Sequence, residues 1–237
     1  MKIGLFSDPH YCKADDLGLN RRPILSLDKI KAAMVDFKEQ GVELCICLGD
    51  LIDHRAGDTK KDILDNLNEV LALIRSFDIP FYLVPGNHDF ADLSRKDWRD
   101  ALVNFPDPVC DFEAGGRKFI LLDANFRTST NHFDTEGHLW DDANLIPPQL
   151  EYLEKVLKGQ KNCIVLVHEN LDSTVDGNHI IKNACDVRKI IEDSGAVDMV
   201  IQGHYHYGSN WQNGNVCYHT LEAMCLGEEN HYEIIEL

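Results

Sequence analysis

The stretch Phe81-Tyr82-Leu83-Val84-Pro85-Gly86-Asn87-His88-Asp89 decides the fold, because an apolar run ends there in three consecutive polar residues. Aromatic and branched residues without polar alternation are typical of a strand that is covered on both faces. Pro85-Gly86 stops such a strand and bends the backbone. We therefore expect Asn87 and His88 to lie just beyond the carboxyl end of a buried strand.

The same pattern occurs at four other places in the chain. The apolar runs are Ile3–Phe6, Leu44–Leu48, Cys163–Val167 and Val197–Gln202. They end, in that order, in Asp8-Pro9-His10, Gly49-Asp50, His168 and Gly203-His204-Tyr205-His206. Amphipathic helical patterns separate the first three strands, and such crossovers predict parallel, right-handed pairing. Because ligands bind beyond the carboxyl ends of strands in open α/β sheets, we expect the five polar clusters to converge.

The second half of the chain has more strand patterns than helix patterns. Its features are a hairpin at Val109–Phe112 and Arg117–Asp123, helices from Pro147 and Asn183, and closing strands at Trp211, Val216–Leu221 and Tyr232–Ile235. The sequence therefore predicts an α/β fold of two packed mixed β-sheets flanked by helices. Since the motifs span Asp8 to His206, we expect residues 1–237 to form a single domain.

Composition narrows the class of protein. The 237 residues are 44% hydrophobic, and 40 acidic against 23 basic side chains give a formal net charge of -17. No apolar run approaches the roughly 20 residues that a membrane helix needs, and binding to nucleic acid or an anionic membrane would be electrostatically opposed. The chain enters a strand pattern directly after Met1-Lys2, so we expect a cytoplasmic protein. The eight dispersed cysteines predict reduced core thiols rather than disulfides or a zinc knot.

The residue types in the polar clusters favour a metal centre. Carboxylate, imidazole and amide ligands without thiolate suit Mn, Fe or Zn. So many ligands favour two ions, about 3.5 to 4 Å apart, over one. Two such ions would bind a phosphate oxygen and lower the pKa of a bridging water, which predicts in-line hydrolysis of a phosphoester. For any single residue the alternative is turn and capping chemistry, and it is the ordered set of five clusters that favours metal.

The ordered motifs resemble the calcineurin-like metallophosphoesterase superfamily over essentially the whole chain. The resemblance implies a four-layer αββα sandwich. It also implies one ion held by Asp8, His10, Asp50 and His206, and a second held by Asp50, Asn87, His168 and His204, with Asp50 and a hydroxide bridging the two ions. His88 would then be the general acid that protonates the leaving oxygen, and Asp89 would orient its ring.

The finer resemblance is to class III cyclic-nucleotide phosphodiesterases and to manganese-dependent ADP-ribose/CDP-alcohol diphosphatases. The latter are suggested by His168–Asp172, Asn183-Ala184 and Tyr218–Met224. These segments favour a small nucleotide phosphodiester or diphosphate as substrate. A phosphomonoesterase or protein phosphatase on the same metal core stays open as the alternative. A catalytically inactive scaffold is the third alternative, against which the retention of His88 and every ligand speaks.

Contacts to the substrate are harder to assign than the ligands. The candidates are Arg22, Arg55, His179 and Asn183, with Arg21 also considered as a phosphate contact. Relatives often place an arginine directly after Gly-Asp-x-x-Asp, whereas here His54 precedes Arg55, and solvated surface charge is the alternative for each arginine. Tyr11, Tyr205 and Tyr207 either stack on a base or fill space beside the site. The loops expected to decide between diester and monoester are Tyr11–Pro23, Phe126–Leu145 and Asp172–Lys182.

Overall fold

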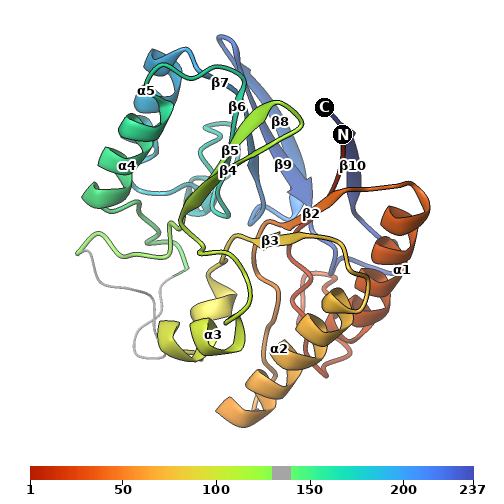
Figure 1. Cartoon of the computed structure of the whole chain (residues 1–237). Helices are drawn as coiled ribbons and strands as arrows, with labels where there is room; N and C mark the ends of the chain where they lie inside the picture. Colours follow the sequence, from red (N-terminus) through yellow and green to blue (C-terminus); the bar gives the residue numbers. More distant parts are fainter. Residues whose placement is uncertain (130–139) are drawn as a thin grey trace.

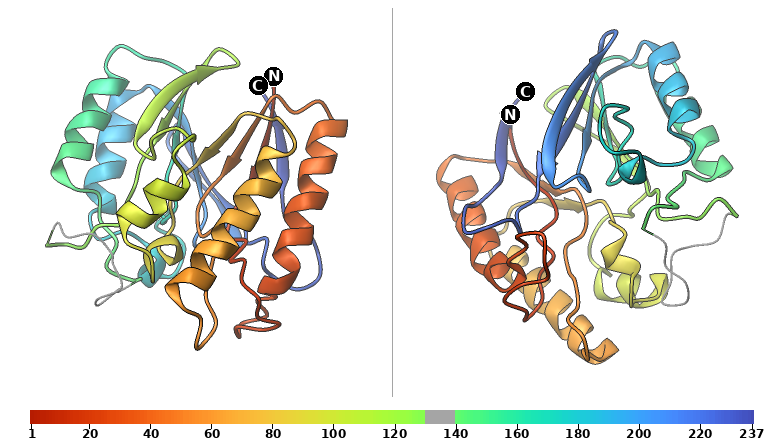
Figure 2. Two further views of the ribbon diagram at one scale, coloured as in Figure 1. Left: turned by 60° about the horizontal axis from the view of Figure 1, so that its bottom comes forward. Right: turned by 180° about the vertical axis from the view of Figure 1, so that it is seen from behind.

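The computed structural model describes residues 1–129 and 140–237, and in it two β-sheets face each other with helices on their outer sides (Figures 1 and 2). The first sheet has the strand order β10-β1-β2-β3. Its strands are β1 (Lys2–Phe6), β2 (Leu44–Cys47), β3 (Phe81–Leu83) and β10 (Glu233–Glu236). The first three are parallel and β10 is antiparallel to β1.

The second sheet has the order β4-β5-β6-β7-β9-β8. Its strands are β4 (Cys110–Ala114), β5 (Arg117–Leu121), β6 (Cys163–Leu166), β7 (Val197–Gln202), β8 (Tyr207–Asn213) and β9 (Val216–Glu222). The four central strands are parallel, and the edge strands β4 and β8 are antiparallel to their neighbours. Both sheets are mixed, so the predicted architecture of two packed mixed sheets flanked by helices is confirmed.

Helices cover the outer face of each sheet. Helices α1 (Ser26–Glu39) and α2 (Lys60–Arg75) lie on the first sheet, and α4 (Pro147–Leu157) and α5 (Ala184–Ser194) lie on the second (Figure 2). Helix α3 (Arg95–Ala101) follows β3. Residues 1–129 and 140–237 also include three single 3₁₀ turns: η1 (Pro23–Leu25), η2 (His88–Phe90) and η3 (Gly177–His179). Because each crossover helix returns the chain to the same end of its sheet, the strand ends with their polar residues gather at one edge.

The core follows the two-residue period of the strands. Ile3 and Leu5 of β1 point between the sheets, where they join Ile164 and Leu166 of β6. The alternate residue Gly4 faces α1, and a Cβ atom there would lie 2.6 Å from the Phe37 ring. The first helix therefore packs closer to β1 than a side chain would allow.

The cysteines are unpaired, as predicted, but not all lie in the core. Among the residues that the structure describes, all eight are free thiols. Cys110 and Cys217 are half-buried and Cys185 is exposed. The expectation of buried core cysteines is therefore wrong for these three: Cys110 is in the edge strand β4, Cys185 in helix α5 and Cys217 in strand β9, each at a position that is partly open to solvent.

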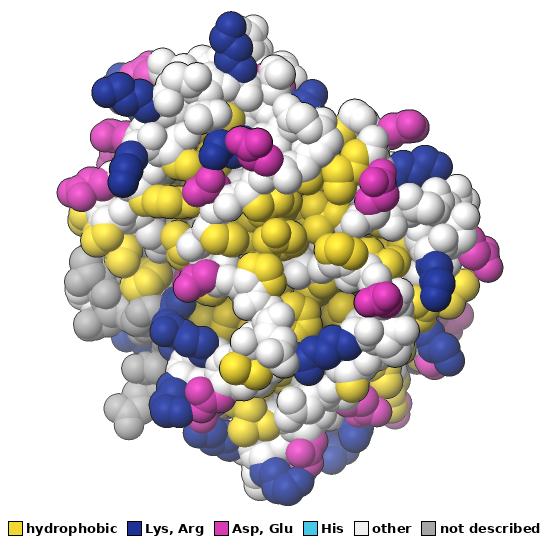
Figure 3. Space-filling model, viewed as in Figure 1, with side chains coloured by type: hydrophobic (Ala, Val, Ile, Leu, Met, Phe, Trp, Pro, Cys, Tyr) yellow, Lys and Arg dark blue, Asp and Glu magenta, His cyan; other side chains and the backbone are white. Residues whose placement is uncertain are grey.

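Charge on the face of the molecule shown in Figure 3 is mixed rather than segregated. On the face shown in Figure 3, Lys and Arg side chains are interspersed with Asp and Glu and form no basic patch. None of the helices within residues 1–129 and 140–237 is long and apolar enough to span a bilayer.

Candidate metal centre

The structure brings the five predicted polar clusters together at the carboxyl ends of β1, β2, β3, β6 and β7. A cavity of about 360 Å³ opens over them, and Asp50, Asn87, His88, His204 and His206 line it. The remaining three predicted ligands are fully buried beside it: Asp8, His10 and His168. All seven residues that the sequence predicted as metal ligands therefore lie in one cluster.

Four of these residues have an unusual backbone. Asp8, His10, Asp50 and His204 have φ values of 53°, 49°, 50° and 66°. The left-handed region is strained for residues other than glycine, at roughly 1 to 3 kcal/mol each. The strain is held by hydrogen bonds between strand ends, since the Asp8 amide donates to the Gly49 carbonyl at 3.0 Å and the His10 amide to the Asp50 carbonyl at 2.9 Å. Such strain is concentrated at functional sites, where side chains must be aimed.

Two histidines present a lone pair to the centre of the cluster. His168 Nδ1 lies 2.6 Å from the Leu48 carbonyl oxygen. Since a carbonyl oxygen only accepts, Nδ1 carries a proton, so Nε2 is the nitrogen that offers a lone pair when the ring is neutral. His10 Nδ1 lies 3.1 Å from Asp53 Oδ2, which fixes its tautomer in the same way. Both contacts are of the kind that orient histidine ligands of metals.

Asp50 lies between the two histidines. Its Oδ2 is 3.5 Å from His10 Nε2 and 3.3 Å from His168 Nε2. Its Oδ1 accepts a hydrogen bond from the His88 amide at 2.7 Å. A side chain at residue 86 would collide with the Asp50 carboxylate, so the glycine of Gly86-Asn87 allows the two loops to approach.

The electrostatics favour ionised carboxylates at the centre and divide the imidazoles into two kinds. Burial opposes protonation of His10 and His168, but the surrounding acidic groups, Asp50 among them, raise the pKa of His10 well above its ordinary value and that of His168 to about 10. Burial opposes ionisation of Asp8 and Asp50, but the neighbouring His168 holds the pKa of both carboxyls below the usual range. Burial, together with His168, lowers the pKa of His204 well below its ordinary value. A neutral His204 can offer a lone pair to a cation.

Unsatisfied acceptors show that the cluster fits the predicted ions. Within the described part of the chain, Asn87 Oδ1, His168 Nε2 and His204 Nε2 are buried and make no hydrogen bond. Buried polar atoms without a partner are costly. Donor atoms of Asp50, His168 and His204 lie within 4.8 Å of one another, as do those of His10, Asp50 and His88. A cation in the first of these groups would bind the lone pairs of His168 Nε2 and His204 Nε2.

The general-acid pair differs from the prediction. The carboxylate of Asp89 accepts from the amides of Leu51 at 3.0 Å and Gly86 at 2.9 Å and is fully buried. The carboxylate beside His88 belongs to Asp53, whose Oδ1 lies 3.2 Å from His88 Nδ1. The prediction that Asp89 orients the His88 ring is therefore wrong in geometry, and Asp53 takes that place.

Asp53 contacts several residues of the site, and the sequence interpretation assigned no role to it. It is 4% exposed, and its Oδ2 also lies 3.2 Å from Arg21 Nη1. Burial opposes its ionisation, yet His88 and His10 hold the pKa of Asp53 far below the usual range. The sequence did contain a signal for Asp53, because this residue is the second aspartate of the Gly-Asp-x-x-Asp motif.

Of the four predicted substrate contacts, His179 alone lines the cavity. Arg22 donates to the Asp15 carbonyl at 2.9 Å and lies near Glu228. Arg55 pairs with Asp58 at 2.8 Å.

Asn183 hydrogen-bonds the backbone of Leu145 through both its donor and its acceptor. The cavity wall instead contains Arg21, which also donates to the Leu17 carbonyl at 2.9 Å.

Other residues at the site carried little or no sequence signal. Trp140 and Leu19 line the cavity from irregular loops. Part of the loop Phe126–Leu145, residues 130–139, lies outside the described residues. Cys225 was predicted to be a core thiol, and it is fully buried with its pKa raised to about 11 by burial, yet its Sγ lies within 4.8 Å of the His10 and His206 donor atoms.

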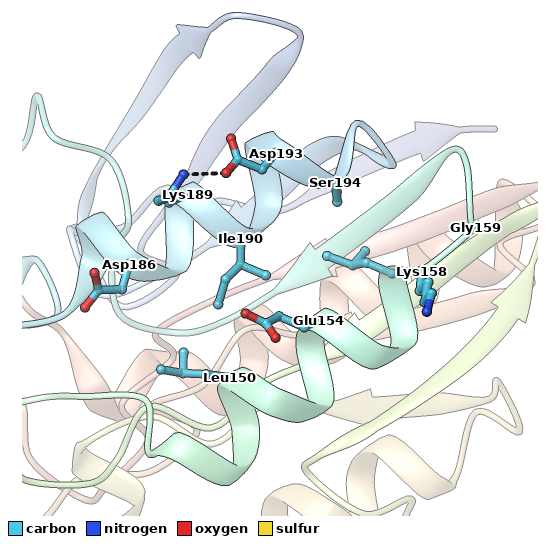
Figure 4. Close-up of a pocket in the computed structure, with 10 residues that line it drawn as sticks. Leu150, Glu154, Lys158, Gly159, Asp186, Lys189, Ile190, Asp193 and Ser194 are labelled. Carbon is cyan, nitrogen blue, oxygen red and sulfur yellow. Dashed lines mark hydrogen bonds and ion pairs between the residues drawn. The ribbon is translucent and has the colours of Figure 1, made fainter.

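A larger hollow of about 650 Å³ lies elsewhere, between α4 and α5 (Figure 4). Leu150 and Ile190 project into it, and Lys189 pairs with Asp193 on its rim. It contains none of the predicted ligands, so the chemistry belongs to the smaller cavity at the strand ends.

Comparison with known proteins agrees with this geometry. Residues 1–208 match the family described as Calcineurin-like phosphoesterase. The chain belongs to this family. Among solved structures, a dimetal phosphatase from Danio rerio superposes with a TM-score of 0.85 at 20% identity, over 100% of this chain and 92% of that one. This metallophosphoesterase thus has the fold of a dimetal phosphatase.

Curated relatives of this metallophosphoesterase have two kinds of name. The serine/threonine-protein phosphatase CPPED1 of Rattus norvegicus is 24% identical over 78% of this chain, and the chain spans 61% of that protein's length. The 3',5'-cyclic-nucleotide phosphodiesterase alr5338 of Nostoc sp. is 25% identical over 95% of this chain and 79% of that protein. Similarity extends to both phosphatases and phosphodiesterases.

Proposed function

We propose that this metallophosphoesterase uses two divalent ions to cleave phosphodiester or diphosphate bonds of small nucleotide-type substrates, with residues 1–237 acting as one domain. The observation that carries the proposal is Asp50 Oδ2, which lies 3.5 Å and 3.3 Å from the lone-pair nitrogens of His10 and His168. A carboxylate in that position bridges two sites. The residues for the first ion are Asp8, His10, Asp50 and His206, and those for the second are Asp50, Asn87, His168 and His204.

The two ions would be Mn, Fe or Zn. When bound, they would polarise the phosphoryl group and lower the pKa of a water molecule. The chain's own residues provide the remaining steps. His88 lines the cavity, and its Nδ1 proton is held by Asp53 at 3.2 Å. Its Nε2 can therefore deliver a proton to the leaving oxygen. Arg21, fixed by Asp53 and the Leu17 carbonyl, faces the same cavity and would bind a phosphoryl oxygen.

A second candidate function is hydrolysis of phosphomonoesters, including those on proteins. It is favoured by the similarity to CPPED1 phosphatases. The phosphodiester reading is favoured by the similarity to cyclic-nucleotide phosphodiesterases. The net charge of -17 disfavours nucleic acid and anionic membranes as partners under either candidate.

The substrate class is tested with metal-stripped protein reloaded with Mn²⁺, Fe²⁺ or Zn²⁺. Initial rates are compared for ADP-ribose, cyclic AMP, an aryl phosphodiester and an aryl phosphomonoester. We expect the diphosphate or the diesters to be cleaved faster than the monoester. The reverse order would support the phosphatase candidate, and no turnover with two ions bound would leave an inactive scaffold.

The roles of Asp50 and His88 are tested by substitution. We expect Asp50→Ala to lose both bound ions and activity. His88→Ala should keep two ions per chain and lose roughly 10²- to 10⁴-fold in rate with an alkyl leaving group, the range of general acid catalysis. It should lose far less with 4-nitrophenolate, which leaves without a proton. His231→Ala, in which the substituted ring pairs with Glu222, is the control. Full activity of His88→Ala on the alkyl substrate would refute the acid role.

A further inference from the structure

Large apolar side chains gather around the mouth of the metal cavity. In the described residues, six large hydrophobic side chains are exposed: Leu19, Ile24, Val35, Val103, Trp140 and Tyr207. Leu19, Trp140 and Tyr207, which are 76%, 40% and 64% exposed, all line the cavity of about 360 Å³ above the ligands. Exposed apolar groups scattered singly need no explanation, but a group of them around one cavity marks a binding surface.

Aromatic rings continue this surface away from the ligands. The ring centroid of Trp140 lies 5.3 Å from that of His179, His179 lies 5.2 Å from Tyr205, and Tyr205 lies 5.8 Å from Tyr207. We name these four residues the aromatic rim. The Trp140 ring is also 5.9 Å from the ring of His204. The rim therefore begins beside a candidate ligand and runs outward to solvent.

The same cavity has a polar side. Arg21 is in its wall, with one guanidinium nitrogen on Asp53 and another on the Leu17 carbonyl. A ligand that satisfies the whole cavity must therefore have an anionic group for the metal ligands and Arg21, and a flat apolar group for the rim. The volume of about 360 Å³ is at the small end of ligand sites, which hold a small molecule rather than a folded partner.

We propose that the aromatic rim binds the base of the nucleotide substrate, and that Trp140 and Tyr207 set the preference for substrates that carry a base. The proposal rests on the proposed function, since it assigns the part of the substrate that is not cleaved. A ring stacks on aromatic side chains largely independently of its hydrogen-bonding edge. The rim therefore accepts purines and pyrimidines and discriminates against phosphoesters without a ring.

The test compares two ligands that share a sugar phosphate and differ in the base. AMP and ribose 5-phosphate are titrated by calorimetry into the Mn²⁺-loaded protein. Stacking on one base contributes roughly 1 to 3 kcal/mol, so we expect AMP to bind at least about fivefold more tightly. Trp140→Ala and Tyr207→Ala should each reduce that ratio toward one and leave the affinity for ribose 5-phosphate unchanged. Val103→Ala, at a residue that is 75% exposed and outside the cavity, is the control.

Tryptophan fluorescence gives a second measurement, which would not change on AMP binding if Trp140 only supported the fold. Trp98 is buried and Trp211 packs against Tyr218, so Trp140 is the tryptophan that faces the cavity. AMP should quench the wild-type emission. Trp140→Phe should retain tight AMP binding without that quenching, because phenylalanine preserves an apolar ring.

The outcomes separate this proposal from the proposed function. If ribose 5-phosphate and AMP bind equally tightly to the wild type, the rim does not bind a base, while phosphate binding at the metal centre stands. If neither ligand binds and no ADP-ribose is cleaved, the proposed function itself fails. Equal loss of both ligands in Trp140→Ala would show that the residue supports the fold of the site, which also overturns the rim proposal.

Discussion

Asp53→Asn is the substitution that most directly tests how the site donates a proton. The carboxylate is 4% exposed and contacts His88 Nδ1 at 3.2 Å with one oxygen and His10 Nδ1 at 3.1 Å with the other. Asparagine keeps the size of the side chain but removes its charge. It also replaces one oxygen by an NH₂ group, which would face a ring N–H donor of His88 or His10.

The expected loss follows from the lost contact. A hydrogen bond to a charged group contributes about 1.5 to 3 kcal/mol. At about 1.4 kcal/mol per factor of ten, kcat should fall roughly 10- to 150-fold. The fall should occur with an alkyl leaving group, which needs a proton, and largely disappear with 4-nitrophenolate, which does not.

The assay is a double-mutant cycle with His88→Ala at saturating Mn²⁺, with the metal content of each variant measured. If Asp53 acts through His88, the double variant should be no slower than His88→Ala alone. Metal content separates this effect from one on His10, a candidate ligand. Independent, multiplying losses in the cycle, or an equal loss with both leaving groups, would refute the reasoning.

Three further predictions concern stability of the metal-free protein. Gly4→Ala should lower the free energy of unfolding by about 1 to 3 kcal/mol through overpacking, because its Cβ would lie 2.6 Å from Phe37. Gly177→Ala is the control, since its Cβ meets nothing within 4 Å and stability should not change. Urea unfolding measures both variants. Asp89→Asn should lower stability by about 1 to 3 kcal/mol, measured in the same way, because its NH₂ would face a backbone N–H.

Glu169 is fully buried with both oxygens unpaired in the described part of the chain, and burial raises its pKa to about 8. A raised folded pKa makes its contribution fully present below about 4.5 and lost as pH rises through about 8. Wild-type stability should therefore fall relative to Glu169→Gln between pH 5 and 8.5, by at least about 1.4 kcal/mol, which equals one pKa unit; a constant difference would contradict this.

The clustering of the candidate ligands could be predicted from the sequence because their placement depends on strands. An apolar run that ends in Gly49-Asp50 or His168 puts its polar residue at a sheet edge whatever the loops do, and parallel pairing aligns those edges. The α/β class and the two mixed sheets followed from the same runs.

The carboxylate beside His88 could not be chosen by proximity in sequence. His88 and Asp89 belong to the 3₁₀ turn η2, in which successive side chains point about 120° apart. Asp89 is thereby directed to the amides of Leu51 and Gly86, away from the His88 ring. Asp53 reaches that ring from the loop after β2, which only the packed structure reveals.

The candidate substrate contacts lie on loops, whose geometry no periodicity encodes. Arg21 and Arg22 are neighbours in an irregular segment, yet one faces Asp53 and the cavity while the other faces Asp15 and Glu228. The ligand cluster is buried and strained into place, whereas Leu19 beside Arg21 is 76% exposed. The ligand cluster and the aromatic rim are therefore held in place by different contacts. Substitutions on the aromatic rim should change which phosphoester binds without releasing metal. Loss of metal in Trp140→Ala would show that the ligand cluster and the aromatic rim are coupled.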